Sequence, residues 1–182
     1  IADSLPNKIL GIAPSVTILP IKVSFPERYY LETYWGQAPI VENPGYFRGF
    51  IYTTSVAYGI QQAVYAGADI INMSIGGKSE GDPYLTDAIN TAYNAGITIV
   101  VSAGNHPNSW SYENIFYPAY LPNVIAVGSS NYAGTARANY SNYGPELDVV
   151  APVGSSTETG VIATTFNCIY DVNDPLVSWD NG

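Results

Sequence analysis

Apolar residues recur along the chain in two arrangements, as stretches with helical spacing and as short continuous runs. Two stretches carry an apolar stripe at intervals of three and four residues: Val56, Ile60, Ala63 and Val64, then Leu85, Ala88, Ile89, Ala92 and Tyr93. This spacing places each stripe on one face of a helix. Thr54 or Ser55 can cap the first predicted helix and Asp82 the second, because their side-chain oxygens accept hydrogen bonds from first-turn amides.

The continuous apolar runs are short and rich in β-branched residues, which is typical of buried strands. They cover residues 16–23, 68–73, 97–101, 124–127 and 147–150, with 161–164 as a further candidate. Gly67 and Gly96 end the predicted helices, and an apolar run follows each of them. Apolar strands that alternate with helices indicate a parallel sheet covered on both faces. We therefore predict one α/β domain with a doubly wound, mostly parallel sheet and helices on both faces.

Residues 24–53 interrupt this pattern. The segment is aromatic, rich in proline and glycine, and without periodicity, so it is predicted as a long loop with one extended piece at residues 50–52. Loops of this length within a compact domain are usually functional or decorative.

Composition narrows the classes of function. The chain has 182 residues, enough for one domain, and its 6 Lys and Arg against 15 Asp and Glu give a net charge of −9. Such an acidic chain is repelled by phosphate backbones, which disfavours nucleic acid as a partner. Hydrophobic residues make up 47% and charged residues 12%, which excludes disorder, yet no run approaches the ~20 apolar residues of a membrane span. One Cys and one His exclude an internal disulfide and a multi-histidine metal site.

Glycine-rich turns follow two of the predicted strands, at residues 74–77 and 102–105. Ligands of open α/β sheets bind beyond the carboxyl ends of parallel strands. Glycine at such an end allows another backbone to approach, which suits an extended peptide and also suits a phosphate. The run Gly76-Gly77-Lys78-Ser79 nearly completes a phosphate-binding loop, but Asn72 stands where the first glycine is required. The next predicted helix also begins too late, so a nucleotide site is disfavoured.

Six short motifs stand along the chain. They are Gly11-Ile-Ala-Pro14, Asn72-Met-Ser-Ile-Gly-Gly77, Ser102-Ala-Gly-Asn105, Tyr117-Pro118, Val124-Ile-Ala-Val-Gly128 and Gly144-Pro-Glu-Leu-Asp-Val-Val-Ala-Pro152. Together, and in this order, they resemble the subtilisin-like serine proteases, the subtilases. The resemblance runs from about residue 9 to residue 152, with 24–53 as a divergent insertion. It implies that residues 1–182 form part of a subtilisin-like peptidase domain.

The resemblance assigns a role to each glycine-rich turn. Asn105 matches the oxyanion-hole Asn, whose neutral amide donates to the negative oxygen that forms when an amide carbonyl is attacked. One wall of the substrate cleft, where a bound peptide pairs as an added strand, is matched by Ser74, Ile75, Gly76 and Gly77. The facing wall of the primary specificity pocket is matched by Ser102, Ala103 and Gly104. Phe116 falls at the base of that pocket, where its bulk predicts small preferred side chains.

The three catalytic motifs of the family are not in this sequence. It contains no Asp-Thr-Gly or Asp-Ser-Gly strand end, no His-Gly-Thr helix start and no Gly-Thr-Ser ahead of a helix. The residues resemble the interior of a subtilase between its His and Ser motifs, and we expect this segment alone to be inactive. His106 is either a base or an exposed residue near the cleft, and the family places its base elsewhere. Cys168 is expected to be a lone thiol.

The chemistry requires no cofactor, but subtilases often bind a structural calcium ion. The loop at residues 4–8 reads Ser-Leu-Pro-Asn-Lys, which is a poor ligand set for the tight site of the family. The backbone carbonyls of Ala119, Leu121 and Val124 match a weaker cation site. Asn139-Tyr-Ser141 fits the glycosylation pattern. Asp148 is expected to pair or cap rather than to catalyse.

Two functions remain open. The first is part of a secreted serine endopeptidase that forms an acyl-enzyme, in which this chain supplies the substrate cleft and the oxyanion hole. Its partners would be polypeptide substrates and the remaining segments of the protease. The start at Ile1 without a leader pattern fits a processed or excised piece, and 16 tyrosines with few lysines fit an extracellular one. The second is a catalytically inactive, subtilase-like module that binds peptides, against which the retained Asn105 argues. Either piece would leave sheet edges and helix-docking surfaces uncovered.

Overall fold

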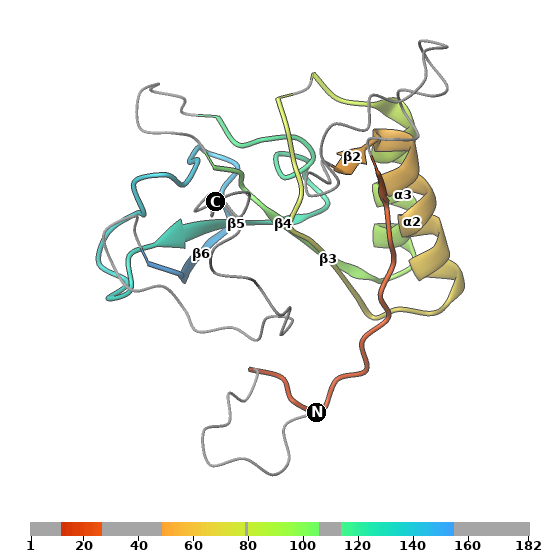
Figure 1. Cartoon of the computed structure of the whole chain (residues 1–182), viewed down its shortest axis with the longest axis horizontal. Helices are drawn as coiled ribbons and strands as arrows, with labels where there is room; N and C mark the ends of the chain where they lie inside the picture. Colours follow the sequence, from red (N-terminus) through yellow and green to blue (C-terminus); the bar gives the residue numbers. More distant parts are fainter. Residues whose placement is uncertain (1–11, 27–48, 79, 106–113, 155–182) are drawn as a thin grey trace, which may run out of the picture.

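The computed structural model describes residues 12–26, 49–78, 80–105 and 114–154 (Figure 1). In chain order the elements are β1 (Ser24–Pro26), β2 (Gly49–Ile51), α2 (Thr53–Tyr65), β3 (Ile70–Met73), α3 (Pro83–Asn94), β4 (Thr98–Ser102), β5 (Ile125–Ser130) and β6 (Val149–Pro152). Both predicted helices are present, and the runs predicted at 68–73, 97–101, 124–127 and 147–150 form strands with shifted ends. Residues 161–164 lie outside the described residues.

The main sheet has the strand order β3-β4-β5-β6, and all neighbouring strands are parallel. The ladder places Met73 opposite Val101 and Ser102 opposite Val127. Because α3 lies between β3 and β4 in the chain, it forms the crossover that a parallel pair requires. The predicted α/β class and the parallel sheet are confirmed.

Residues 16–23 differ from the prediction, because they form no strand of the main sheet. Within the described residues this run pairs with no neighbour, and the side chains of Val16, Ile18 and Leu19 are 61%, 79% and 51% exposed. A strand needs backbone hydrogen bonds to a second strand, so apolar composition alone does not create one. Only the following residues 24–26 form β1, which pairs antiparallel with β2. β2 confirms the extended piece predicted inside 24–53, shifted to residues 49–51.

The helix ends confirm most of the predicted caps. Asp82 accepts a hydrogen bond from the Leu85 amide at 3.0 Å and so caps α3. Gly67 and Gly96 follow the two helices with φ of 72° and 82°, in the left-handed region that glycine adopts without strain. After each helix, the amide of the glycine and that of the next residue bond back to the last turn.

The predicted cap at Thr54 or Ser55 is wrong. α2 begins earlier, at Thr53, and its N-cap residue Tyr52 makes no side-chain capping bond. The Thr53 hydroxyl instead donates to the Asp82 carboxylate at 2.8 Å. One carboxylate therefore serves the first turns of both helices and links them.

α2 and α3 pack against each other and share one core with the sheet. Strand residues Met73, Ile99, Val101 and Ala126 belong to that core, together with Ile97 and Val124, which directly precede β4 and β5. Alternate strand positions point away from it, and Ile70, Ile125 and Val149 are 62%, 38% and 49% exposed. Both described helices therefore cover the same face of the sheet (Figure 1). The helices predicted for the second face are not among the described residues.

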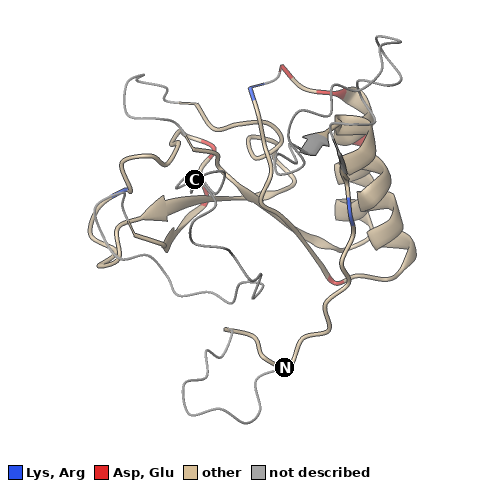
Figure 2. Ribbon diagram, viewed as in Figure 1, with Lys and Arg blue, Asp and Glu red and all other residues tan. Residues whose placement is uncertain are grey.

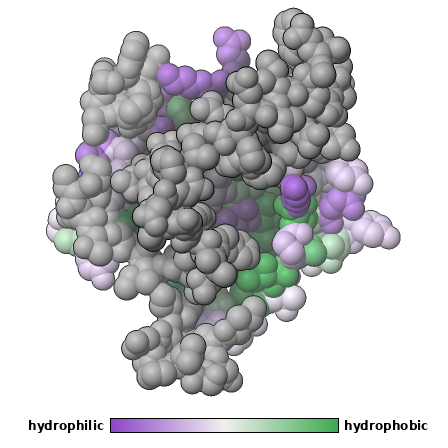
Figure 3. Space-filling view, in the orientation of Figure 1, coloured by the Kyte–Doolittle hydropathy of each residue, from purple (hydrophilic) through white to green (hydrophobic). Residues whose placement is uncertain are grey.

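The described surface carries few charges and considerable apolar area. Charged residues are scattered along the ribbon (Figure 2), and the space-filling view shows apolar residues exposed beside polar ones (Figure 3). None of the helices in the described part of the chain is long and apolar enough to cross a membrane.

Candidate active site

The two glycine-rich turns lie next to each other at the carboxyl ends of β3 and β4. The ladder between these parallel strands ends at the pair Met73–Val101 and β4 itself ends at Ser102, so residues 74–77 and 103–105 leave the sheet at the same edge. Ser74, Gly76 and Asn105 are exposed to solvent. The structure therefore brings together the residues predicted to form the two walls of a cleft.

A third segment, residues 115–117, ties the two turns together. Gly77 and Tyr117 exchange two backbone hydrogen bonds, at 3.0 and 3.1 Å. The Phe116 amide donates to the Ala103 carbonyl at 3.0 Å. Because both walls are bonded to one short segment, their separation is fixed, and Phe116 lies between them.

Gly104 and Phe116 are in close contact. Gly104 has a φ of 96°, which a residue with a side chain rarely adopts. A methyl group at this position would come within 2.5 Å of a Phe116 ring carbon and 2.7 Å of the Asn142 amide nitrogen. The Phe116 ring therefore lies directly against the second wall, a position that fits its predicted place at the base of a small pocket.

Residues 141 and 142 hold the second turn from the other side, and the sequence reasoning missed them. Asn105 pairs with Ser141 in an antiparallel bridge. The backbone amide of Asn142 donates to the Gly104 carbonyl at 2.9 Å, and its side-chain Nδ2 donates to the Ala103 carbonyl at 3.2 Å. No periodicity or charge marks these residues in the sequence, because only the closed chain brings them to the turn. Ser141 is 3% exposed, so the predicted glycosylation pattern includes a buried serine.

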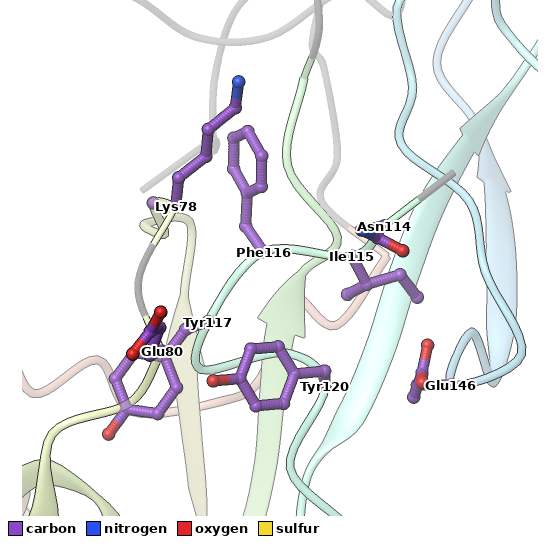
Figure 4. Close-up of a pocket in the computed structure, with 9 residues that line it drawn as sticks. Lys78, Glu80, Asn114, Ile115, Phe116, Tyr117, Tyr120 and Glu146 are labelled. Carbon is purple, nitrogen blue, oxygen red and sulfur yellow. The ribbon is translucent and has the colours of Figure 1, made fainter. Parts of the chain in front are cut away.

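A cavity of about 620 Å³ opens beside Phe116 (Figure 4). Its lining is Gly77, Lys78, Glu80, Asn114, Ile115, Phe116, Tyr117, Tyr120 and Glu146. The rings of Tyr117 and Tyr120 lie 5.5 Å apart. Burial raises the pKa of Tyr120, with further contributions from Tyr117 and Glu80. The cavity shares Gly77 and Phe116 with the cleft and borders it.

A smaller pocket of about 180 Å³ lies beside the first wall. Its lining is largely apolar and comprises Ile51, Thr53, Val56, Ile75, Gly76, Gly77, Leu85, Tyr117 and Pro118. The pocket joins the start of α2 to the turn after β3. An apolar side chain of a ligand lying along this wall would find room there.

The nucleotide alternative lacks the helix terminus that it requires. A phosphate-binding loop presents unpaired amides at a helix N-terminus, where the helix dipole favours negative charge. Here the Leu85 amide of α3 is already bonded to the Asp82 carboxylate, which would repel a phosphate. Gly77, in the middle of the supposed loop, is paired with Tyr117.

The predicted cation site stays a prediction. Ala119 and Val124 are buried and Leu121 is half-buried. Within the described ranges no three His, Cys, Asp or Glu side chains come together, so a cation there would rely on carbonyl oxygens. Asp148 accepts a hydrogen bond from the Ala126 amide at 2.8 Å, which is the pairing role predicted for it. His106, Cys168 and residues 4–8 lie outside the described residues.

Comparison with known proteins identifies the family. The sequence profile of the subtilase family matches residues 1–177. Subtilisin DY from Bacillus licheniformis is 38% identical over 144 residues, which make up 79% of this chain and 44% of that protein. An extracellular protease from Xanthomonas campestris is 43% identical over 98 residues, or 54% of this chain and 16% of that protein.

Solved structures agree with the sequence match. Proteases from Pseudoalteromonas arctica share the fold with a TM-score of 0.52 and 34% identity, over 59% of this chain and 34% of theirs. The chain spans less than half the length of the curated relatives it matches. Because the family profile covers almost the whole chain and the parallel sheet is shared with proteases of known structure, the chain belongs to the subtilase family.

Proposed function

We propose that this chain forms the substrate cleft and supplies the oxyanion-hole amide of a subtilisin-like serine endopeptidase that acts outside the cell. The observation that carries the proposal is the convergence of residues 74–77, residues 102–105 and Phe116 at one edge of the parallel sheet. Membership of the subtilase family supports serine protease chemistry. The likeness to an extracellular protease supports the location.

In this proposal the reaction is acyl transfer from a peptide to a serine hydroxyl. The serine Oγ attacks the scissile carbonyl carbon, a histidine takes the hydroxyl proton, and an aspartate orients that histidine. All three come from segments of the complete protein that carry motifs absent from this sequence. Attack turns the carbonyl oxygen into an oxyanion, and the Asn105 side-chain amide donates a hydrogen bond to it. Asn105 is exposed, and the Asn142 amide holds the carbonyl of the preceding Gly104 in the bridge that sets Asn105 opposite Ser141, so the Asn105 side chain can meet a substrate in a fixed place.

The substrate lies extended between residues 74–76 and residues 102–104, and pairs with their backbones as an added strand. Side chains of an extended peptide alternate between the two faces of the strand. One of them meets the Phe116 ring, which restricts that position to small side chains. Another reaches the apolar pocket of about 180 Å³ beside Ile75.

The decisive experiment uses the complete protein that contains this chain. We expect it to react with a fluorophosphonate probe and to hydrolyse peptides, whereas residues 1–182 alone do neither. Asn105→Ala should lower kcat by about 10²–10³, the loss measured for an oxyanion donor in subtilisin, and should leave KM nearly unchanged. Asn90→Ala on α3 is the matched control, because the Asn90 side-chain oxygen accepts a hydrogen bond from Asn123, outside the cleft.

Two results would contradict the proposal. If the complete protein binds peptides but neither hydrolyses them nor reacts with the probe, it is the inactive peptide-binding module. If Asn105→Ala keeps full kcat in an active protease, the oxyanion is held by other donors and the role assigned to Asn105 is wrong.

A further inference from the structure

Asn142 is the polar member of a buried set. It is 1% exposed, and the other large side chains that are almost fully buried are Ile89, Ile99 and Val101. Its Oδ1 is buried and accepts no hydrogen bond from the residues that the structure describes. Leaving an amide oxygen unpaired costs about 1–3 kcal/mol, so an asparagine at this position needs a reason.

The reason lies in the two carbonyl groups to which the N–H groups of Asn142 donate hydrogen bonds. The Ala103 carbonyl accepts two hydrogen bonds, one from the Phe116 amide at 3.0 Å and one from Asn142 Nδ2 at 3.2 Å. The Gly104 carbonyl accepts the backbone amide of Asn142 at 2.9 Å. With the side-chain amide reversed, Oδ1 would face the Ala103 oxygen, so the assignment of Nδ2 to this bond is the one that is chemically sound.

These hydrogen bonds hold the carbonyls of Ala103 and Gly104, the two residues directly before Asn105. The Ala103 carbonyl is bonded to the Asn142 side chain and the Gly104 carbonyl to the Asn142 backbone amide, and the second of these bonds belongs to the bridge that places Ser141 opposite Asn105. Gly104, at a φ of 96°, leaves the space that Asn142 Nδ2 occupies. A displacement of about 1 Å in a catalytic group can cost about 10² in rate, so the placement of the turn matters for any donor at its end.

We propose that Asn142 is a positioning residue, which holds the Ala103–Gly104 backbone so that the Asn105 amide points at the oxyanion. The inference rests on the proposed protease function and adds a residue to it. A side chain placed only to fill the core would be apolar at this site. A polar one with an unpaired oxygen fits a position where local stability is given up for geometry.

The test uses the complete protease, with the concentration of active enzyme set by titration with a fluorophosphonate, so that unfolded molecules are not counted. Asn142→Ala should lower kcat per titrated site by about 10–100-fold and change KM by less than about threefold. If the alanine variant fails to fold, Asn142→Leu keeps the branched shape and the buried volume, removes the Nδ2 donor together with the unpaired oxygen, and should show the same loss of kcat. Asn90→Ala is again the control.

The sharpest result comes from combining substitutions. Because Asn142 acts through Asn105, the double variant Asn105→Ala/Asn142→Ala should lose no more than about twofold beyond Asn105→Ala alone. The positioning role would be overturned if the kcat losses of the two single variants multiply in the double variant. It would also be overturned if Asn142→Ala leaves kcat per titrated site unchanged in an active enzyme. A wild-type protein that neither titrates nor hydrolyses peptides would instead refute the proposed function, and the inference with it.

Discussion

Phe116 lies between two glycines whose missing side chains give it room. A methyl group at Gly76 would come within 3.2 Å of the Tyr117 carbonyl and 3.4 Å of the Phe116 Cβ, and one at Gly104 would meet the ring at 2.5 Å. The family resemblance predicts Phe116 at the base of the specificity pocket, and the glycines were visible as a pattern. The φ of Gly104 and the burial of Asn142 were not visible, because both depend on chain segments that meet only after folding.

We expect Phe116 to set the size of the substrate side chain that the specificity pocket prefers. Replacing it by alanine removes the ring from between the walls, so a large substrate residue next to the scissile bond gains room. One methylene in an apolar pocket changes discrimination by about 10–200-fold, so Phe116→Ala should raise kcat/KM for a Phe substrate relative to an Ala substrate by about tenfold or more. A series of peptides with Ala, Leu or Phe at that position measures the ratio in the complete protease. Phe116→Leu should fall between the two, and a ratio that stays constant across the three enzymes would refute the role of the ring.

The helices and strands differ in how well their sequence predicts them. α3 was predictable at both ends, because Asp82 and Gly96 each act through their own neighbours in sequence. The start of α2 was not, because the Thr53 hydroxyl bonds to Asp82, a residue far along the chain. The strand predicted at residues 16–23 was wrong for the same reason, since a strand depends on a partner strand that its own sequence does not contain.

The shared cap makes the stability of the helix pair depend on pH. The Leu85 amide, followed by the Thr53 hydroxyl, lowers the pKa of Asp82 below its ordinary value of 3.8. A lowered pKa means that the folded state favours the carboxylate, so the stabilisation is complete above the unfolded pKa and is lost as the pH falls through the folded pKa. Between pH 5 and pH 7, Asp82→Ala should therefore lower the melting temperature of the complete protein by an amount that does not depend on pH. Below about pH 4 the difference should shrink, because the wild-type carboxylate becomes protonated.

Asp87→Ala controls for the loss of one negative charge on the same helix. It removes a carboxylate from α3 without touching the cap, so its effect on the melting midpoint should be small. A gap between wild type and Asp82→Ala that stays equal from pH 7 down to pH 3 would show that the cap works without its charge.

For the molecule as a whole, the arrangement of the two helices is the consequential feature. They cover one face of the sheet, while the other face presents apolar residues that include Ile70 at 62% exposure and Val149 at 49%. From the near-continuous apolar strands we predicted that helices cover both faces of the sheet. The described residues supply helices for one face only, so the second face still requires cover. Subtilase membership gives the cover an expected source in the remaining segments of the complete protein.

The open face leads to opposite expectations for the chain and for the complete protein. Residues 1–182 alone should self-associate and bind a hydrophobic dye, because an uncovered apolar sheet face gains free energy by finding a partner. Ile70→Thr/Val149→Thr removes apolar area from the open face and keeps β-branched residues in the strands. It should therefore reduce association of the isolated chain, measured by light scattering. In the complete protein the same pair should lower stability by about 1 kcal/mol or more, because covered positions lose apolar burial and gain buried hydroxyls. Tyr65→Thr/Tyr93→Thr, at helix positions that are 90% and 52% exposed, should change neither result. A monomeric chain that melts cooperatively and binds no dye would mean that the face is already covered by this chain itself.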